Sequence, residues 1–338
     1  MKSGSDFSSI LKNPERGLRM AEILAPGPGG CILDEKVKEQ VWSMLPFNNV
    51  MGAAPDFLSA DDDADIFLFD AEAEYLKVLA EADIDVIWKM SGSYLLNHHQ
   101  TRSDCTSHGA AGAMEDEQMV EIMWRGTAAE FKPICTEPLY GGAVVTIMGW
   151  TGDNGAYTNA PLKYAIDYGF LPRGVYGSYD LTNYNDNLVL QFCRNGVPSI
   201  LLEPQSEMRL RTIVPVHSYE EGSAFLRQGY SVVGGSNQGF SMTRDKDGFC
   251  KPQGSWAHCT RFRGRRTGRR PGWAYGQSWG AGVPGGPKNI TLDSGRVLEL
   301  PEGTFFVDPD TINRMIRQGE FYAVSKMDSF KTLDYKFY

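Results

Sequence analysis

The 338-residue sequence lacks several features that mark common protein classes. None of its six scattered cysteines forms a CxxC pair, which argues against a zinc site, and no motif for a cofactor is present. No apolar run approaches the roughly 18 residues of a membrane-spanning helix. The first residues also lack the apolar block of a signal peptide. These absences predict a protein that has no metal, cofactor or membrane segment and that stays inside the cell.

The chain is also not basic, since its net charge is −9. A chain of this sign is not expected to bind nucleic acid. Reduced cysteines are the default for such a protein, although two pairings stay open under oxidation. These join Cys135 to Cys193 and Cys250 to Cys259.

The segment that stands out runs from Gln100 to Ala113 and joins a polar turn to a series of very small residues. It predicts a helix that begins near Cys105 and packs closely against a neighbour. A cysteine at a helix N-terminus has a lowered pKa, because the helix dipole favours the thiolate. Gln100 lies five residues earlier and could direct an amide N–H to the same point. The alternative is an inert cysteine at the start of a core helix.

A thiol nucleophile needs a base, and His258 is the strongest candidate. It lies in a predicted strand, residues 255–262, opposite a second predicted strand, 273–280. On such a hairpin Gln277 could orient the imidazole and Trp279 could shield their hydrogen bond. His108, one helical turn after Cys105, is a local alternative that lacks an orienting partner.

The order of these residues resembles the papain-like cysteine peptidase family. The resemblance covers residues 84–325 and implies an α+β fold with two lobes, a helical one and a strand-rich one. It implies that Cys105 is the nucleophile, His258 the general base and Gln100 the oxyanion donor. Gln277 then stands where the family has an asparagine. A peptide or protein is the implied substrate.

The resemblance also divides the chain and suggests where the substrate binds. Residues 1–84 would be an assembly arm or a propeptide-like extension, 85–325 the papain-like domain and 326–338 a tail. The Gly-rich segment before the predicted helix 160–168 is similar to the family's substrate wall. The implied substrate-binding residues are Gly152, Asp153, Asn154, Gly155 and Trp279.

Two stretches, Asp104–Ala111 and Leu300–Asp308, resemble papain-fold proteins encoded by bacteriophages. They imply a location in the virion or the host cytoplasm, with other virion proteins as partners. Three departures from the cellular enzymes leave open a catalytically silent structural protein. The Gln-to-Cys spacing is five where those enzymes have six, Gln277 replaces asparagine, and the usual disulfide cysteines near the nucleophile are absent.

A cluster of arginines follows the candidate base. The segment 263–272 is predicted to be a basic hairpin loop that could bind an acidic partner subunit. The alternative is a solvated loop balanced by nearby carboxylates. The candidate partner-binding residues are Arg263, Arg265, Arg266, Arg269 and Arg270.

Overall fold

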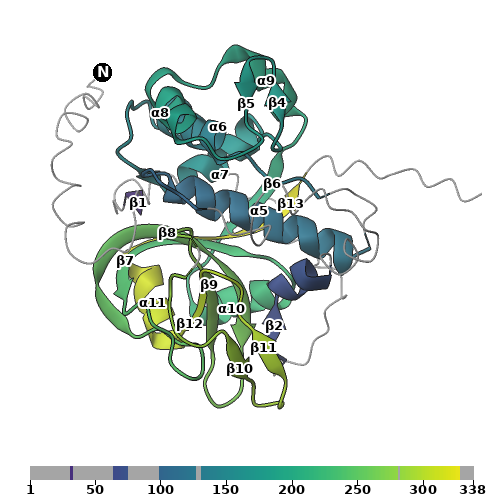
Figure 1. The fold of residues 1–338 in the computed structure, drawn as a ribbon, viewed down its shortest axis with the longest axis vertical. Coiled ribbons are helices and arrows are strands. Elements are labelled where there is room, and N and C mark those ends of the chain that lie inside the picture. Colours follow the sequence, from purple (N-terminus) through teal and green to yellow (C-terminus); the bar gives the residue numbers. More distant parts are fainter. Residues whose placement is uncertain (1–30, 33–63, 75–98, 127–130, 281, 328–338) are drawn as a thin grey trace, which may run out of the picture.

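The computed structural model describes residues 31–32, 64–74, 99–126, 131–280 and 282–327. One long helix, α5 (Cys105–Met123), lies between a helical part and a part built on a sheet, as Figure 1 shows. Cys105 is its first residue, as predicted from the sequence. Within the described ranges, no helix has the length and apolar character needed to cross a membrane.

The sheet follows the strand order β12-β9-β8-β7-β13-β6, and β2 pairs with β8 beside this path. Helices α10 (Tyr219–Arg227) and α11 (Pro309–Gln318) lie with it in the lower part of Figure 1. The strands are β2 (Ile66–Phe67), β6 (Leu210–Pro215), β7 (Val232–Phe240), β8 (Pro252–Arg266), β9 (Gly272–Gly276), β12 (Thr304–Val307) and β13 (Glu320–Met327).

Helices dominate the other part, which lies above α5 in Figure 1. These are α6 (Thr136–Gly141), the π-helix η3 (Gly142–Ile147), α7 (Asn159–Asp167), α8 (Asp186–Asn195) and α9 (Ser199–Ser206). The short strands outside the large sheet form three pairs: β1 (Cys31–Ile32) with β3 (Ala156–Tyr157), β4 (Val175–Tyr176) with β5 (Tyr179–Asp180), and β10 (Asn289–Thr291) with β11 (Val297–Glu299).

Small residues allow α5 to approach β8 closely, and the predicted close packing is confirmed. A Cβ atom on Gly109 would lie 3.1 Å from the sulfur of Cys259. A Cβ atom on Gly112 would lie 1.9 Å from a terminal nitrogen of Arg261. Glycine at these two positions therefore makes room for side chains that β8 sends toward the helix.

The structure corrects two local predictions. Residues 263–266 belong to the long strand β8 and not to a hairpin loop. Residues 141–148 are an apolar run, which by itself predicts a strand or a buried turn. They are mostly helical, because packing against α7 and α8 overrides the β propensity of Val144, Val145 and Thr146.

The predicted N-terminal extension is described only in part. A helix predicted over 34–45 lies outside the described residues. Residues 66–67 pair with β8, and residues 69–74 are helical. Phe67 is packed in a cluster with Phe249 and Phe306 of the sheet part. This portion of the expected extension is therefore integrated into the core of the sheet part.

Candidate active site

Cys105 occupies the first position of α5 and is fully buried. Its sulfur accepts a hydrogen bond from the backbone N–H of Cys259, at 3.4 Å. The residue before Cys259 in β8 is His258. The fold thus brings the helix start and this strand together across 154 positions of sequence. The dipole of α5 favours a thiolate at this position.

His258 is almost completely buried, at 2% exposure. Burial, with a smaller contribution from the charge of His108, lowers the pKa of its imidazole to about 3. Both ring nitrogens are without a hydrogen-bond partner among the described residues. His258 is consequently a neutral imidazole at pH 7, with a nitrogen able to accept a proton.

Trp279, not Gln277, lies against the imidazole. The ring centroids of His258 and Trp279 are 4.1 Å apart with an interplanar angle of 23°. Strand β8 pairs with β9 so that Arg261 is opposite Gly276. This register, continued past the end of β9, sets position 279 opposite position 258, which is why the expected His258–Gln277 contact is not formed.

The two glutamines make other hydrogen bonds. The side-chain oxygen of Gln277 accepts from the backbone N–H of Trp279, and its NH2 group donates to the carbonyl of Val283. The side-chain NH2 of Gln100 donates to the carbonyl of Arg102 at 3.0 Å, and its oxygen accepts from the hydroxyl of Ser278. Gln100 therefore joins the helix start to the segment after β9, but its amide is engaged by a local carbonyl.

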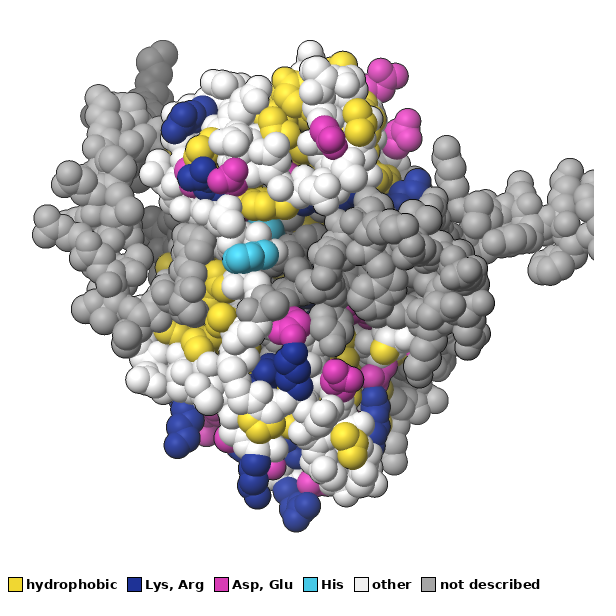
Figure 2. Space-filling model, in the orientation of Figure 1, with side chains coloured by type: hydrophobic (Ala, Val, Ile, Leu, Met, Phe, Trp, Pro, Cys, Tyr) yellow, Lys and Arg dark blue, Asp and Glu magenta, His cyan; other side chains and the backbone are white. Residues whose placement is uncertain are grey.

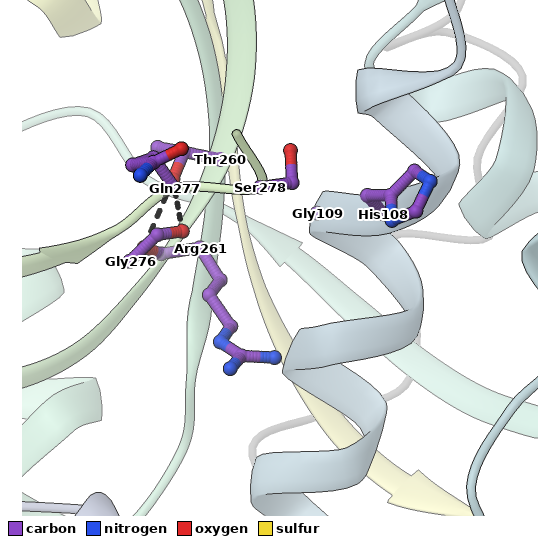
Figure 3. Close-up of a pocket in the computed structure, with 7 residues that line it drawn as sticks. All are labelled: His108, Gly109, Thr260, Arg261, Gly276, Gln277 and Ser278. Atoms are coloured by element: carbon purple, nitrogen blue, oxygen red, sulfur yellow. Dashed lines mark hydrogen bonds between the residues drawn. The ribbon is translucent and has the colours of Figure 1, made fainter. Parts of the chain in front are cut away.

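A small polar cavity of about 10 Å³ lies between α5 and the two strands (Figure 3). In this view His108 is on the helix and Gln277 and Ser278 are on the opposite wall, while the side chain of Arg261 extends toward α5. The volume is close to that of one water molecule. The cavity is too small for a peptide side chain, so it is not the substrate pocket.

Buried polar groups fix the turn that leads into α5. One carboxylate oxygen of Asp104 lies 3.2 Å from Nε2 of His108 and accepts a hydrogen bond from the hydroxyl of Tyr184 at 3.0 Å. Asp104 precedes the helix without capping it through its side chain. Sequence reasoning missed Tyr184, because nothing in the sequence marks a tyrosine 80 positions away as a partner.

The predicted substrate-wall residues form a tight turn before β3. Gly152 and Gly155 have positive φ values of 100° and 87°, which glycine adopts without strain. Asp153 accepts from the backbone N–H of Ser103 and from the hydroxyl of Tyr140, both at 3.1 Å. Asn154 is exposed. This turn is therefore attached directly to the segment that carries Cys105.

Strand β1 lies along the same wall. It pairs in parallel with β3, with Cys31 opposite Ala156. Cys31 is 5% exposed, and its sulfur is 3.4 Å from the hydroxyl oxygen of Thr158. Its thiol belongs to the same apolar cluster as the thiols of Cys105 and Cys259. A segment from the N-terminal part of the chain thus packs into the same apolar cluster as Cys105.

The arginines divide into two groups. Arg263, Arg265 and Arg266 are buried in the sheet part, so a partner at the surface cannot reach them. Their prediction as partner-binding residues is wrong because they lie within β8, where Arg263 pairs with Glu72 at 2.7 Å and with Asp116 at 2.9 Å.

The other two arginines follow β8. Arg269 pairs with Asp293, and Arg270 pairs with Asp245 and Asp247. Local carboxylates therefore balance both charges, which agrees with the alternative of a solvated loop. Partner binding by these two residues stays a prediction.

In the space-filling view, a histidine side chain is visible between the upper and lower parts of the molecule (Figure 2). Among the described residues, no group of three or more histidine, cysteine or carboxylate side chains is arranged to hold a metal ion.

Comparison with known proteins gives matches of structure only. No protein-family model matches the chain, and no curated protein matches its sequence. The structure of xylellain, a cysteine protease from Xylella fastidiosa, is similar over 89% of this chain and 97% of that chain, with a TM-score of 0.56 and 12% identity.

Procathepsin B S9 from Trypanosoma congolense covers 89% of this chain and 87% of its own, with a TM-score of 0.48 and 12% identity. At 12% sequence identity, the similarity to the structure of xylellain establishes the fold alone. The α+β chain, with Cys105 at the start of the helix between its two parts, has the papain-like fold of cysteine proteases.

Proposed function

We propose that the protein is a peptidase that hydrolyses peptide bonds through Cys105 and His258. The observation that carries the proposal is the contact between the first residue of α5 and the backbone next to His258. It joins a helix start, which favours a thiolate, to a strand that carries a neutral imidazole.

In the proposed reaction the sulfur of Cys105 attacks the carbonyl carbon of the substrate, and its proton passes to His258. The imidazolium then protonates the leaving amine, so that a thioester remains, and water hydrolyses this thioester. The backbone N–H of Cys105 is a donor for the oxyanion. Gln100 becomes a second donor when its amide leaves the carbonyl of Arg102.

The structure represents a closed state of the proposed enzyme. Cys105 has no exposed surface, and β1 contacts the substrate wall beside it. We infer that the part of the N-terminal extension that carries β1 acts as a propeptide, and that this segment must leave before substrate enters. The bacteriophage setting stays a prediction that rests on sequence resemblance.

The test of this function uses a variant in which β1 is displaced from the site. Cys31→Glu places a carboxylate near Glu320, whose charge already acts on the thiol of Cys31. Like charges in an apolar cluster repel, so β1 is expected to leave. Val297→Glu, at an exposed position, is the matched control for added charge.

The measurement is alkylation of Cys105 by iodoacetamide from pH 5 to 9, together with hydrolysis of a peptide library. We expect the Cys31→Glu protein to label at Cys105 faster than at the other cysteines and to cleave peptides. Replacing His258 by alanine in that background should abolish both effects. If Cys105 is inert in the opened protein, or labels equally without His258, the chain is a silent structural member of the fold.

A further inference from the structure

Three cysteine thiols gather at the point where β1 meets the nucleophile. Cys105 lies at the start of α5, Cys259 on β8 and Cys31 on β1, and all three belong to one buried cluster. None of the three forms a disulfide in the structure. The peptidase mechanism uses only Cys105, which leaves two buried thiols without an assigned role.

The contacts show how close the segments are. A Cβ atom on Gly235 would lie 2.4 Å from the sulfur of Cys31. Gly235 is the antiparallel partner of Cys259, and Cys259 donates its N–H to the sulfur of Cys105. Cys31 and Cys105 therefore lie against the same pair of residues in the sheet, and glycine at 235 leaves the space that Cys31 occupies.

The same proximity is visible in the electrostatics. Burial raises the pKa of the Cys31 thiol well above its usual range, and negative charge on Cys105 raises it further. Conversion of Cys105 to a neutral species removes that second contribution. Oxidation of Cys105 therefore relieves part of the rise in the pKa of the Cys31 thiol, while the larger effect of burial remains.

We propose that Cys31 is a resolving cysteine that captures oxidised Cys105 in a reversible disulfide and so locks β1 over the active site. The capture itself does not depend on peptidase activity, whereas its role as a lock rests on the function proposed above. The oxidant is hydrogen peroxide, which reaches Cys105 when β1 lifts.

The chemistry balances in two steps. The thiolate of Cys105 attacks one oxygen of the peroxide, the O–O bond breaks, and the departing hydroxide takes a proton to become water. This leaves Cys105 as a sulfenic acid. The sulfur of Cys31 then attacks the sulfur of Cys105, and the sulfenic hydroxyl leaves with the proton of Cys31 as a second water. Two thiols are oxidised and one peroxide is reduced to two waters.

The test treats the full chain with hydrogen peroxide and maps its disulfides by mass spectrometry without reduction. We expect a peptide that links Cys31 to Cys105, and its reduction by dithiothreitol should restore alkylation of Cys105. In Cys31→Ser the link should disappear and Cys105 should proceed to irreversible sulfinic acid. Cys250→Ser, which changes a buried cysteine outside the thiol cluster, should behave like the unmodified protein.

The outcomes separate this inference from the proposed function. A link between Cys259 and either other thiol, or equal sulfinic acid formation with and without Cys31, would overturn the resolving role. If the expected link forms but the opened protein cleaves no peptide, the redox site remains and the peptidase proposal fails. If peptides are cleaved but no link forms, the peptidase proposal remains and the resolving role of Cys31 fails.

Discussion

The first turn of α5 and the region three turns further along carry buried polar groups in two different ways. At Glu115 and Asp116 the helix faces arginines of β8, and each charge has a partner of opposite sign. Asp116 lies 3.4 Å from Arg261 and 2.9 Å from Arg263. Beside the first turn, on β8, both ring nitrogens of His258 have no hydrogen-bond partner in the described part of the chain.

The two regions illustrate two roles that buried polar groups can have: one holds the structure together, and the other, in the proposed enzyme, serves the chemistry. A buried cation among carboxylates fixes the position of helix and strand, and its groups are not available for other bonds. A buried imidazole without a partner costs stability but keeps a nitrogen available for a proton. The same helix thus attaches to the sheet at one region and, in the proposed enzyme, carries the nucleophile at the other.

The largest expected effect comes from breaking the ionic region. Arg263→Met leaves Glu72 and Asp116 buried without their shared cation and should lower the free energy of unfolding by about 3–5 kcal/mol. Urea denaturation followed by circular dichroism measures this. Arg269→Met removes an ion pair whose arginine is 87% exposed and should leave the free energy of unfolding nearly unchanged. Equal losses in the two variants would contradict the assigned role of the buried network.

A smaller effect is expected from crowding the same region. Gly112→Ala places a methyl group in the space of the Arg261 side chain and should destabilise the protein by about 1–3 kcal/mol. Gly285→Ala is the matched control, because nothing lies within 4 Å of its Cβ position. Thermal unfolding of both variants gives the comparison, and an unchanged Gly112→Ala protein would show that Arg261 can move aside without cost.

The smallest effect concerns His258 and appears as a dependence on pH. Its pKa is about 3 in the folded state, below the ordinary value of the unfolded chain. The unfolded state therefore binds the proton first, and stability falls as the pH decreases below about 6.5. Between pH 7.5 and 5.5 the loss assigned to this group is about 1.4 kcal/mol.

Chemical denaturation at the two pH values tests this linkage. The His258→Phe variant should lose less stability over this interval than the unmodified protein, by the stated amount. His217→Phe is the control, since the side chain of His217 is 55% exposed. An identical pH dependence in the His258→Phe variant and the unmodified protein would show that His258 is not a buried neutral group.

The sequence was sufficient to predict α5, the hairpin that carries His258, and the meeting of these elements. Helical spacing of apolar residues and strand alternation are local signals, and both survive in the structure. The arginines of β8 were wrongly predicted to lie in a surface loop, because their burial depends on carboxylates that are distant in the sequence. Glu115 and Asp116 precede Arg261 by more than 140 positions, so the residues near the arginines give no sign of them.

The orientation of Gln277 could not be predicted for a different reason. It depends on the register between β8 and β9, where pairing is irregular between Phe262 and Arg265. A shift of this kind changes which side chains are neighbours without changing the strands themselves. Cys31 was not recognised either, because its place beside the nucleophile arises from a parallel pairing across 125 positions, Cys31 with Ala156.

The position of β13 has a consequence for how the protein is synthesised. This strand lies between β7 and β6, and among the strands that the structure describes β6 has no other neighbour in the sheet. Residues 210–215 therefore wait, unpaired, until residues 320–327 have left the ribosome. We expect the sheet to close late in translation, after the segment with Cys105 has already been exposed to the cell. Until that moment, the thiol of Cys105 lacks the buried setting that the closed sheet helps to form.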